Sequence, residues 1–221
     1  MNTIDWSFHG PLLWSNTLDT IYMVGVSLIV GGLLGLLLGI ALYTTRGGGL
    51  LANRALYAVL NFVVNLVRPV PFLILLFAIG PVTLALVGTT IGPTGAIVPL
   101  SVAATFGFSR IVEQNLVSID PGIIEAARAT GASRWRIIGT LLVPEALGPL
   151  ILGYTFLVVA LIDMSVMAGA IGGRGLGDFA LQYGYRRWNF PVMWIAIAVI
   201  IVLVQVAQAV GNRLSRLALR R

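Results

Sequence analysis

Few side chains in this 221-residue sequence could carry out covalent chemistry. There is no cysteine and only one histidine, His9, which excludes thiolate catalysis, disulfides and metal sites built from these residues. All 14 basic residues are arginine. Without a lysine, the chain cannot form the G-x-x-x-x-G-K-[ST] loop that binds nucleotide phosphates. We therefore predict no catalytic residue, no metal and no cofactor in this chain, and any ATP-driven step must come from another subunit.

One short string matches an enzyme motif. Gly175-Leu176-Gly177-Asp178 has the G-x-G-D pattern of intramembrane aspartyl proteases. Such an enzyme needs two facing carboxylates that share a proton. Asp178 is expected instead in an outer loop beside Arg174, on the same hairpin arm as Asp163. The sequence therefore does not predict an enzyme.

Two ionisable residues, Arg68 and Asp163, lie in otherwise apolar stretches. Burying such a group in a membrane costs about 2.5–3.5 kcal/mol on insertion scales, which makes each a functional hypothesis. They could form a buried ion pair, or they could line a substrate path, and the sequence leaves both open. Ser165 and Met167 follow Asp163 closely. A methionine thioether suits a surface that contacts another thioether, although methionine is also common in ordinary packing.

The composition decides which elements must position these residues. Hydrophobic residues make up 58% of the chain and charged residues 10%, whereas soluble domains carry roughly 25% charged residues. This excludes a soluble domain, a disordered chain and a nucleic-acid-binding protein, despite a net charge of +6. We predict an all-α integral membrane protein whose residues 1–221 form one transmembrane domain.

Five spans are expected, because apolar stretches long enough to cross a bilayer recur along the chain. Residues 1–17, which include Trp6 and Trp14, are predicted to lie at the membrane interface. Gly31, Gly35 and Gly39 in the first span form a stripe that allows close helix packing, within the chain or across a dimer. The spans lie at about 21–43, either 55–80 or 69–88, 96–115, 146–172 and 190–210. In the 69–88 division, residues 55–67 lie along the interface.

The distribution of arginines predicts the orientation. With the N-terminus outside and the C-terminus in the cytoplasm, and with Arg68 left aside because its side is ambiguous, ten arginines lie on the inner side and three on the outer side, as the positive-inside rule requires. The inner residues are Arg46, Arg54, Arg110, Arg128, Arg134, Arg136, Arg213, Arg216, Arg220 and Arg221, and the outer ones are Arg174, Arg186 and Arg187. The polar segment 116–145 is therefore cytoplasmic.

This cytoplasmic segment contains signals for two short helices. Asp120 followed by proline predicts a helix start at 121, and Gly131 predicts its end after residue 130. Ser133 can cap a second helix over 134–142, and Pro144 precedes the fourth span. Residues 110–145 contain four arginines and four acidic residues, so the pair lacks the basic face that a DNA-binding helix pair needs.

The spacing in this segment resembles the EAA loop of binding-protein-dependent ABC importers. The matching residues are Glu125-Ala126-Ala127, then Gly131, Leu141 and Val143-Pro144, with Leu141 and Val143 as conservative departures from that pattern. In that family the loop forms coupling helices that dock into a groove on the ATPase subunit. The resemblance implies an ATPase-coupling role for Glu125, Ala126, Ala127, Gly131, Ser133 and Pro144.

Further segments are similar to methionine-importer permeases. They are Arg68-Pro69-Val70-Pro71-Phe72, the run from Ser165 to Gly172, Gly175-Leu176-Gly177-Asp178 and Tyr183-Gly184-Tyr185; Val166 and Arg174 depart from the pattern, Arg174 within a glycine run. From the resemblance and the membrane depth together, we expect a translocation path or gate at Arg68, Pro71, Asp163, Ser165 and Met167.

The resemblance implies a type I importer permease in the bacterial inner membrane that moves methionine by alternating access. The implied partners are a second copy of the chain, two cytoplasmic ATPase subunits that hold ATP and magnesium, an extracytoplasmic methionine-binding protein, and membrane lipid. The alternatives are a permease of the same architecture for another amino acid or small polar solute, and a membrane enzyme or stand-alone channel.

Overall fold

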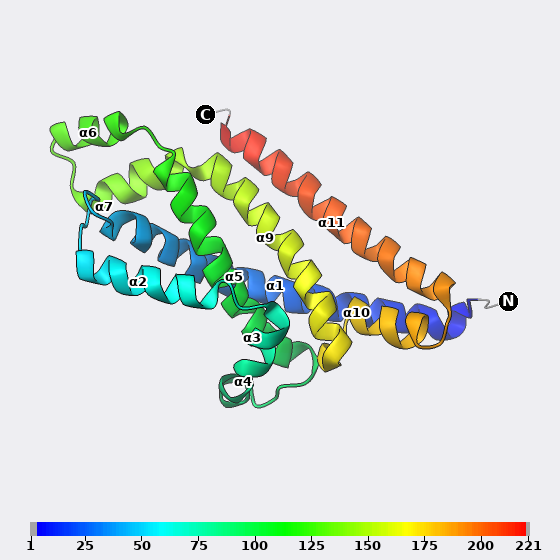
Figure 1. Ribbon diagram of the computed structural model, residues 1–221. Coiled ribbons are helices and arrows are strands. Elements are labelled where there is room, and N and C mark those ends of the chain that lie inside the picture. Colours follow the sequence, from blue (N-terminus) through cyan, green and yellow to red (C-terminus); the bar gives the residue numbers. More distant parts are fainter. Residues whose placement is uncertain (1–3, 220–221) are drawn as a thin grey trace.

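The computed structural model describes residues 4–219, which form helices and connecting turns without a strand (Figure 1). The longer helices are α1 (Trp6–Thr45), α2 (Arg54–Val67), α5 (Gly92–Val117), α9 (Leu147–Ala168) and α11 (Phe190–Leu219). The short ones are α3 (Phe72–Ala78), α4 (Gly80–Val87), α6 (Pro121–Ala129), α7 (Arg134–Ile137), α8 (Val143–Glu145) and α10 (Leu176–Phe179). Two π-helical segments, η1 (Ile138–Leu142) and η3 (Ala180–Tyr185), continue neighbouring helices. A third segment, η2 (Gly169–Gly173), contains a kink at Ile171 and Gly172, whose backbone angles are not helical.

The first helix is longer than the sequence suggested. At 40 residues, α1 is about 60 Å long, roughly twice the thickness of a bilayer's hydrocarbon core. Asp5 caps its first turn by accepting a hydrogen bond from the Ser7 amide at 3.0 Å. Pro11 lies inside α1 and has no amide hydrogen to donate to the preceding turn, yet the helix continues past it. The expected interfacial stretch is therefore no separate element, because from Trp6 onward it continues the first span.

The second span is a broken one. α2 and α3 meet at an angle of 106°, because Pro69 and Pro71 lack the amide hydrogens that a continuous helix would use. A second break at Ile79 separates α3 from α4. Both predicted divisions, 55–80 and 69–88, are thus wrong as single helices. Arg68 ends α2 and Pro71 precedes α3.

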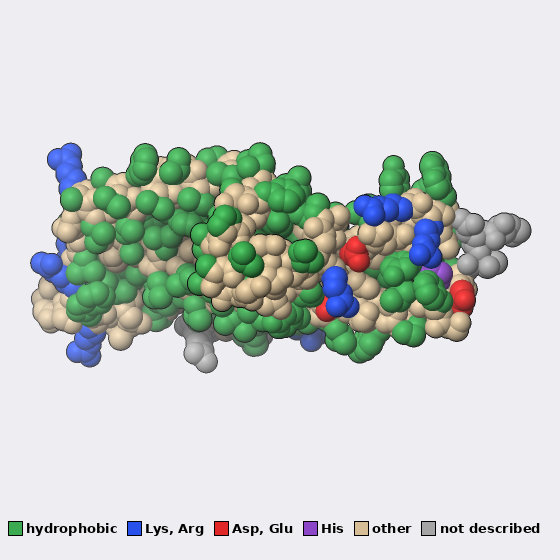
Figure 2. Space-filling model, turned by 90° about the horizontal axis from the view of Figure 1, so that it is seen from below, with side chains coloured by type: hydrophobic (Ala, Val, Ile, Leu, Met, Phe, Trp, Pro, Cys, Tyr) green, Lys and Arg blue, Asp and Glu red, His purple; other side chains and the backbone are tan. Residues whose placement is uncertain are grey.

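The third, fourth and fifth spans are confirmed: they lie at Gly92–Val117, Leu147–Gly173 and Phe190–Leu219, the last ending nine residues beyond the predicted bound. Four helical segments of the described chain are long and apolar enough to cross a membrane, and the bent pair α2–α3 makes up to five. In Figure 2 hydrophobic side chains cover the middle of the molecule, and most of the visible charged ones lie toward its two ends. α6 and α7 lie at the opposite end from the N-terminus (Figure 1), as the predicted orientation requires. Arg220 and Arg221 lie outside the described residues.

The glycine stripe of α1 packs against α5 of the same chain. A Cβ on Gly35 would lie 2.8 Å from the Thr105 carbonyl oxygen, and one on Gly39 would lie 2.5 Å from that of Ser109. Contacts this close exclude any side chain. The stripe is therefore occupied within one chain, which confirms intramolecular packing and leaves no room for a dimer seam on this face.

We expect Gly39→Ala to lower the thermal stability of the purified protein, because overpacking a tight contact costs about 1–3 kcal/mol. Gly25→Ala on the same helix is the matched control, since a Cβ there meets nothing within 4 Å. The control should be neutral or slightly stabilising, because alanine favours helix by about 1 kcal/mol over glycine. Thermal unfolding in detergent measures both, and equal behaviour of the two variants would contradict the packing.

Candidate coupling loop and translocation face

The first cytoplasmic helix, α6, presents most of its surface to solvent. Asp120 caps it by accepting a hydrogen bond from the Gly122 amide at 2.8 Å, as predicted. Ile124 and Ala127 are half-buried against the core, whereas Glu125 and Ala126 are exposed. α6 is thus held to its own chain along one side, and small and acidic side chains are available to a partner on the other.

Gly131 ends α6 in the predicted manner. Its φ of +80° lies in the left-handed region that favours glycine. The Ala132 amide donates to the Ala127 carbonyl at 3.3 Å and the Gly131 amide to that of Arg128 at 3.0 Å, which is the Schellman pattern of helix termination. A Cβ on Gly131 would meet nothing within 4 Å, so backbone conformation alone requires the glycine.

The second cytoplasmic helix begins as predicted but ends differently. Ser133 caps it by accepting a hydrogen bond from the Arg136 amide at 3.4 Å. The expected helix over 134–142 is split into α7 and the π-helical η1, and it runs on through α8 to Glu145. Pro144 has no amide hydrogen to donate to the preceding turn, and a widened π-helical turn accommodates it.

Trp135, at the start of α7, is an exposed residue that the sequence analysis did not single out. Its side chain is 73% exposed, although a tryptophan side chain is ordinarily mostly buried. The available signal was the aromatic residue itself, set between Arg134 and Arg136 in the cytoplasmic segment. Tryptophan and arginine are enriched at the centres of protein interfaces.

Arg68 and Asp163 do not form the ion pair considered above. Within residues 4–219 the ion pairs are Arg110–Glu113 and Arg174–Asp19. Both Arg68 and Asp163 are exposed on the single chain. Two charges within membrane-spanning segments are therefore turned outward rather than toward each other.

The other residues predicted for the path divide between surface and core. Met167 lies one turn beyond Asp163 and is 40% exposed, on a face of α9 that also carries the exposed Phe156. Pro71 is exposed at the break between α2 and α3. Ser165 is buried, and its hydroxyl donates to the Ile162 carbonyl at 2.7 Å. The structure thus brings Asp163 and Met167 onto one exposed face and directs Ser165 away from it.

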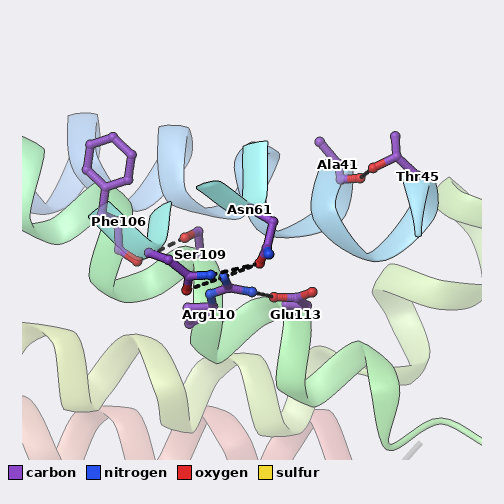
Figure 3. Close-up of polar contacts among 8 residues, drawn as sticks. Ala41, Thr45, Asn61, Phe106, Ser109, Arg110 and Glu113 are labelled. Atoms are coloured by element: carbon purple, nitrogen blue, oxygen red, sulfur yellow. Dashed lines mark hydrogen bonds and ion pairs between the residues drawn. The ribbon is translucent and has the colours of Figure 1, made fainter. Parts of the chain in front are cut away.

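A polar cluster between α2 and α5 was also missed (Figure 3). Arg110 donates to Glu113, to Asn61 and, at 2.7 Å, to Asn65. The side chains of Arg110 and Glu113 are only 12% and 11% exposed. The i, i+3 spacing of Arg110 and Glu113 was a usable signal, but no sequence feature indicated that α2 crosses α5 at that turn.

Comparison with known proteins identifies the family. Residues 20–219 match the family described as binding-protein-dependent transport system inner membrane component. The chain belongs to this family.

Similar proteins of the family carry related names. The chain is 44% identical to the probable D-methionine transport system permease protein MetI of Vibrio cholerae, over 97% of this chain and 96% of that protein. It is 38% identical to the methionine import system permease protein MetP of Bacillus subtilis, over 95% and 94%. A chain of the methionine ABC transporter MetNI, solved in inward-facing conformations, is 40% identical, with a TM-score of 0.91 over 94% of this chain and 96% of that one. The fold is accordingly that of a type I importer permease, in a multi-pass inner-membrane protein.

Arg174, the departure from the glycine run, carries backbone strain. Its φ of 61° and ψ of −163° lie in a region that is essentially restricted to glycine. Its guanidinium pairs with Asp19 of α1 at 3.1 Å while remaining 57% exposed. Strain of this kind costs about 1–3 kcal/mol, whereas an exposed ion pair contributes about 0–1 kcal/mol.

We therefore expect Arg174→Gly to raise the midpoint of thermal unfolding, because the strain that it removes exceeds the ion pair that it deletes. Arg186→Gly is the matched control, since φ at Arg186 is an ordinary −65° and glycine there should lower the midpoint. Calorimetry in detergent measures both variants. Destabilisation of Arg174→Gly to the same degree as the control would contradict the assignment of strain.

Proposed function

We propose that this chain is the permease subunit of an ATP-driven importer that moves methionine across the bacterial inner membrane. The names of the similar proteins and the likeness to the MetNI chain support this substrate and this mode of transport. The observation that carries the proposal furthest is α6, an exposed helix with the Glu-Ala-Ala spacing, placed at the end of the molecule opposite the N-terminus (Figure 1).

The partner at α6 and α7 is proposed to be an ATPase subunit, one for each of two permease copies. No lysine is present for a nucleotide-binding loop, so ATP and magnesium would be held by that subunit. Ala126 permits close approach and Glu125 offers an acceptor, while Trp135 provides an apolar anchor. Movement of the ATPase pair would then be transmitted through α6 to the spans.

If α7 docks in this way, Trp135→Ala should weaken the association of permease and ATPase by about 2 kcal/mol, or roughly 30-fold in Kd. The physical reason is that a tryptophan side chain buried by the partner contributes far more binding free energy than a charged side chain at the rim of the interface. Arg134→Ala, an exposed neighbour, should have little effect. Titration of purified permease with the ATPase subunit measures both, and an unchanged affinity for Trp135→Ala would argue against α7 as a contact.

A second copy of the chain is proposed to cover the exposed charges. A carboxylate such as Asp163 on a lipid-facing surface would cost about 2.5–3.5 kcal/mol, so this face must meet protein or water. A two-fold dimer with a path along its axis meets that requirement. Arg68, Pro71, Asp163 and Met167 would line the path or its gate, with Ser165 supporting α9 from inside.

The proposed mechanism is alternating access within one transmembrane domain. ATP binding would draw the two ATPase subunits together and open the path to the outside, where an extracytoplasmic methionine-binding protein delivers substrate. Hydrolysis would return the path to the inward-facing arrangement. No covalent step is assigned to the permease.

The experiment that tests this function is uptake of labelled methionine into proteoliposomes that contain the permease, its ATPase and the binding protein. Uptake should require all three proteins and internal ATP, and other amino acids at tenfold excess over methionine should compete poorly. Uptake by the permease alone would overturn the importer assignment, and preferential uptake of another solute would overturn the substrate.

A further inference from the structure

A polar groove lies between α2 and the cytoplasmic half of α5. Its volume is about 470 Å³, and all but one of its lining residues have a polar or charged side chain: Asn65, Arg68, Arg110, Glu113, Gln114 and Val117. Arg110 is seven residues from the end of α5 at Val117, so the groove begins roughly 10 Å inside the cytoplasmic end of that helix. Such a concentration of polar groups is unexpected in a chain with only 10% charged residues.

Hydrogen bonds fix one wall of the groove. Arg110 lies between the carboxylate of Glu113 and the amide oxygens of Asn61 and Asn65 (Figure 3), and Asn65 donates in turn to Asn61 at 3.3 Å. Arg110 therefore has acceptors on both helices and joins α2 to α5. Because the N–H groups of its guanidinium are occupied in this way, Arg110 holds the wall in place rather than binding a ligand.

The other wall presents a guanidinium without a partner. Arg68 caps the end of α2 through its backbone amide, which donates to the Val64 carbonyl at 3.0 Å. Its guanidinium is exposed and makes no hydrogen bond or ion pair with any residue between 4 and 219. A guanidinium pairs most strongly with a carboxylate, in a bidentate geometry. The same lining contains the Glu113 carboxylate, which already pairs with Arg110, and the Gln114 side-chain amide. The lining thus offers a guanidinium without a partner on Arg68 and an amide oxygen on Gln114.

We propose that this groove is a binding site for the zwitterionic part of an amino acid on the cytoplasmic side of the path. Arg68 binds the α-carboxylate, and the side-chain oxygen of Gln114 accepts hydrogen bonds from the α-ammonium group. Binding at this site does not depend on contacts with the thioether end of the substrate. This inference rests on the proposed function and adds the substrate groups that are recognised during release.

The absence of cysteine from the chain makes a direct test feasible. Val117→Cys places a single thiol of the permease in the groove, and Ser118→Cys places one at the next position, exposed but outside the lining. The rate at which a charged methanethiosulfonate modifies each thiol is measured in the nucleotide-free complex of permease and ATPase, without binding protein. Methionine is added at millimolar concentration, and 3-(methylthio)propylamine, which lacks the carboxylate, is added separately.

Methionine should slow modification of Val117→Cys about threefold when two thirds of the grooves are occupied, and should leave Ser118→Cys unchanged. The amine should protect poorly. Arg68→Gln should abolish protection by methionine, whereas Arg54→Gln, on the same helix outside the groove, should preserve it. If Arg68→Gln fails to assemble, the comparison of methionine with the amine decides the question.

Equal protection by the amine, or protection that survives Arg68→Gln, would overturn the proposal. Protection by an anionic phospholipid but not by methionine would assign the groove to a lipid headgroup and would also overturn it. Methionine uptake by the native complex with binding protein is measured in parallel. Uptake without protection contradicts only the groove, whereas protection without uptake supports the groove and contradicts the proposed function.

Discussion

Replacing Glu125 with arginine should reduce ATP-dependent methionine uptake by about tenfold or more without unfolding the spans. A tenfold reduction corresponds to a loss of roughly 1.4 kcal/mol in the free energy that couples the ATPase to the permease. Glu125 is exposed on α6, and none of the described residues pairs with it. Its carboxylate is therefore available to the ATPase, and reversing its charge places a repulsive group in the contact. Uptake and ATP hydrolysis are measured on the same proteoliposomes, and we expect hydrolysis that is no longer stimulated by substrate delivery.

Thr130→Ala is the control for this experiment, because it lies on the same turn-rich segment, outside the Glu-Ala-Ala spacing. It deletes only a local hydrogen bond to the Ala127 carbonyl. Thermal unfolding should be the same for the two variants and the native chain. Wild-type coupling in Glu125→Arg would show that α6 does not transmit the nucleotide-driven movement.

Asp163→Leu should abolish most of the transport while leaving the protein as stable as before or more so. If Asp163 faced lipid, leucine would remove an insertion cost of about 2.5–3.5 kcal/mol and uptake would be untouched. If it faces the path, where water or protein solvates the carboxylate, stability changes little while uptake falls about tenfold or more, because a polar contact in the path is removed. Uptake and thermal unfolding together separate the two cases.

Phe156→Leu is the matched control, since Phe156 is 66% exposed on the same face of α9. It should change neither uptake nor assembly substantially. Unimpaired uptake in Asp163→Leu would remove α9 from the translocation path and leave the charge without an assigned role.

Local signals in the sequence were sufficient to predict the helix caps of the cytoplasmic segment and the close packing of α1. Asp120, Gly131 and Ser133 act within a few residues of their own position, so their roles could be predicted without knowledge of the rest of the fold. The glycine stripe of α1 likewise specified a close helix contact, although only the structure shows that α5 of the same chain supplies it.

The features that could not be predicted depend on how distant segments meet. Two prolines follow Arg68, yet the sequence analysis expected one unbroken helix in this region, because the 106° bend depends on where α3 and α4 find contacts. Arg110 and Asn61 are 49 residues apart in sequence, and no local pattern links them. Similarly, apolar periodicity could place Asp163 in a span without showing which face of α9 remains uncovered.

The most direct test of the account is a cross-link from α6 to the nucleotide-hydrolysing partner. Ala126→Cys supplies the only thiol of the permease on the exposed side of α6, and a short thiol-to-amine cross-linker is applied to native membranes. We predict a permease–ATPase adduct whose yield changes when ATP is bound. If none of the cross-linked products contains the ATPase, while the same membranes still take up methionine, the claim that this loop couples ATP hydrolysis to transport is contradicted.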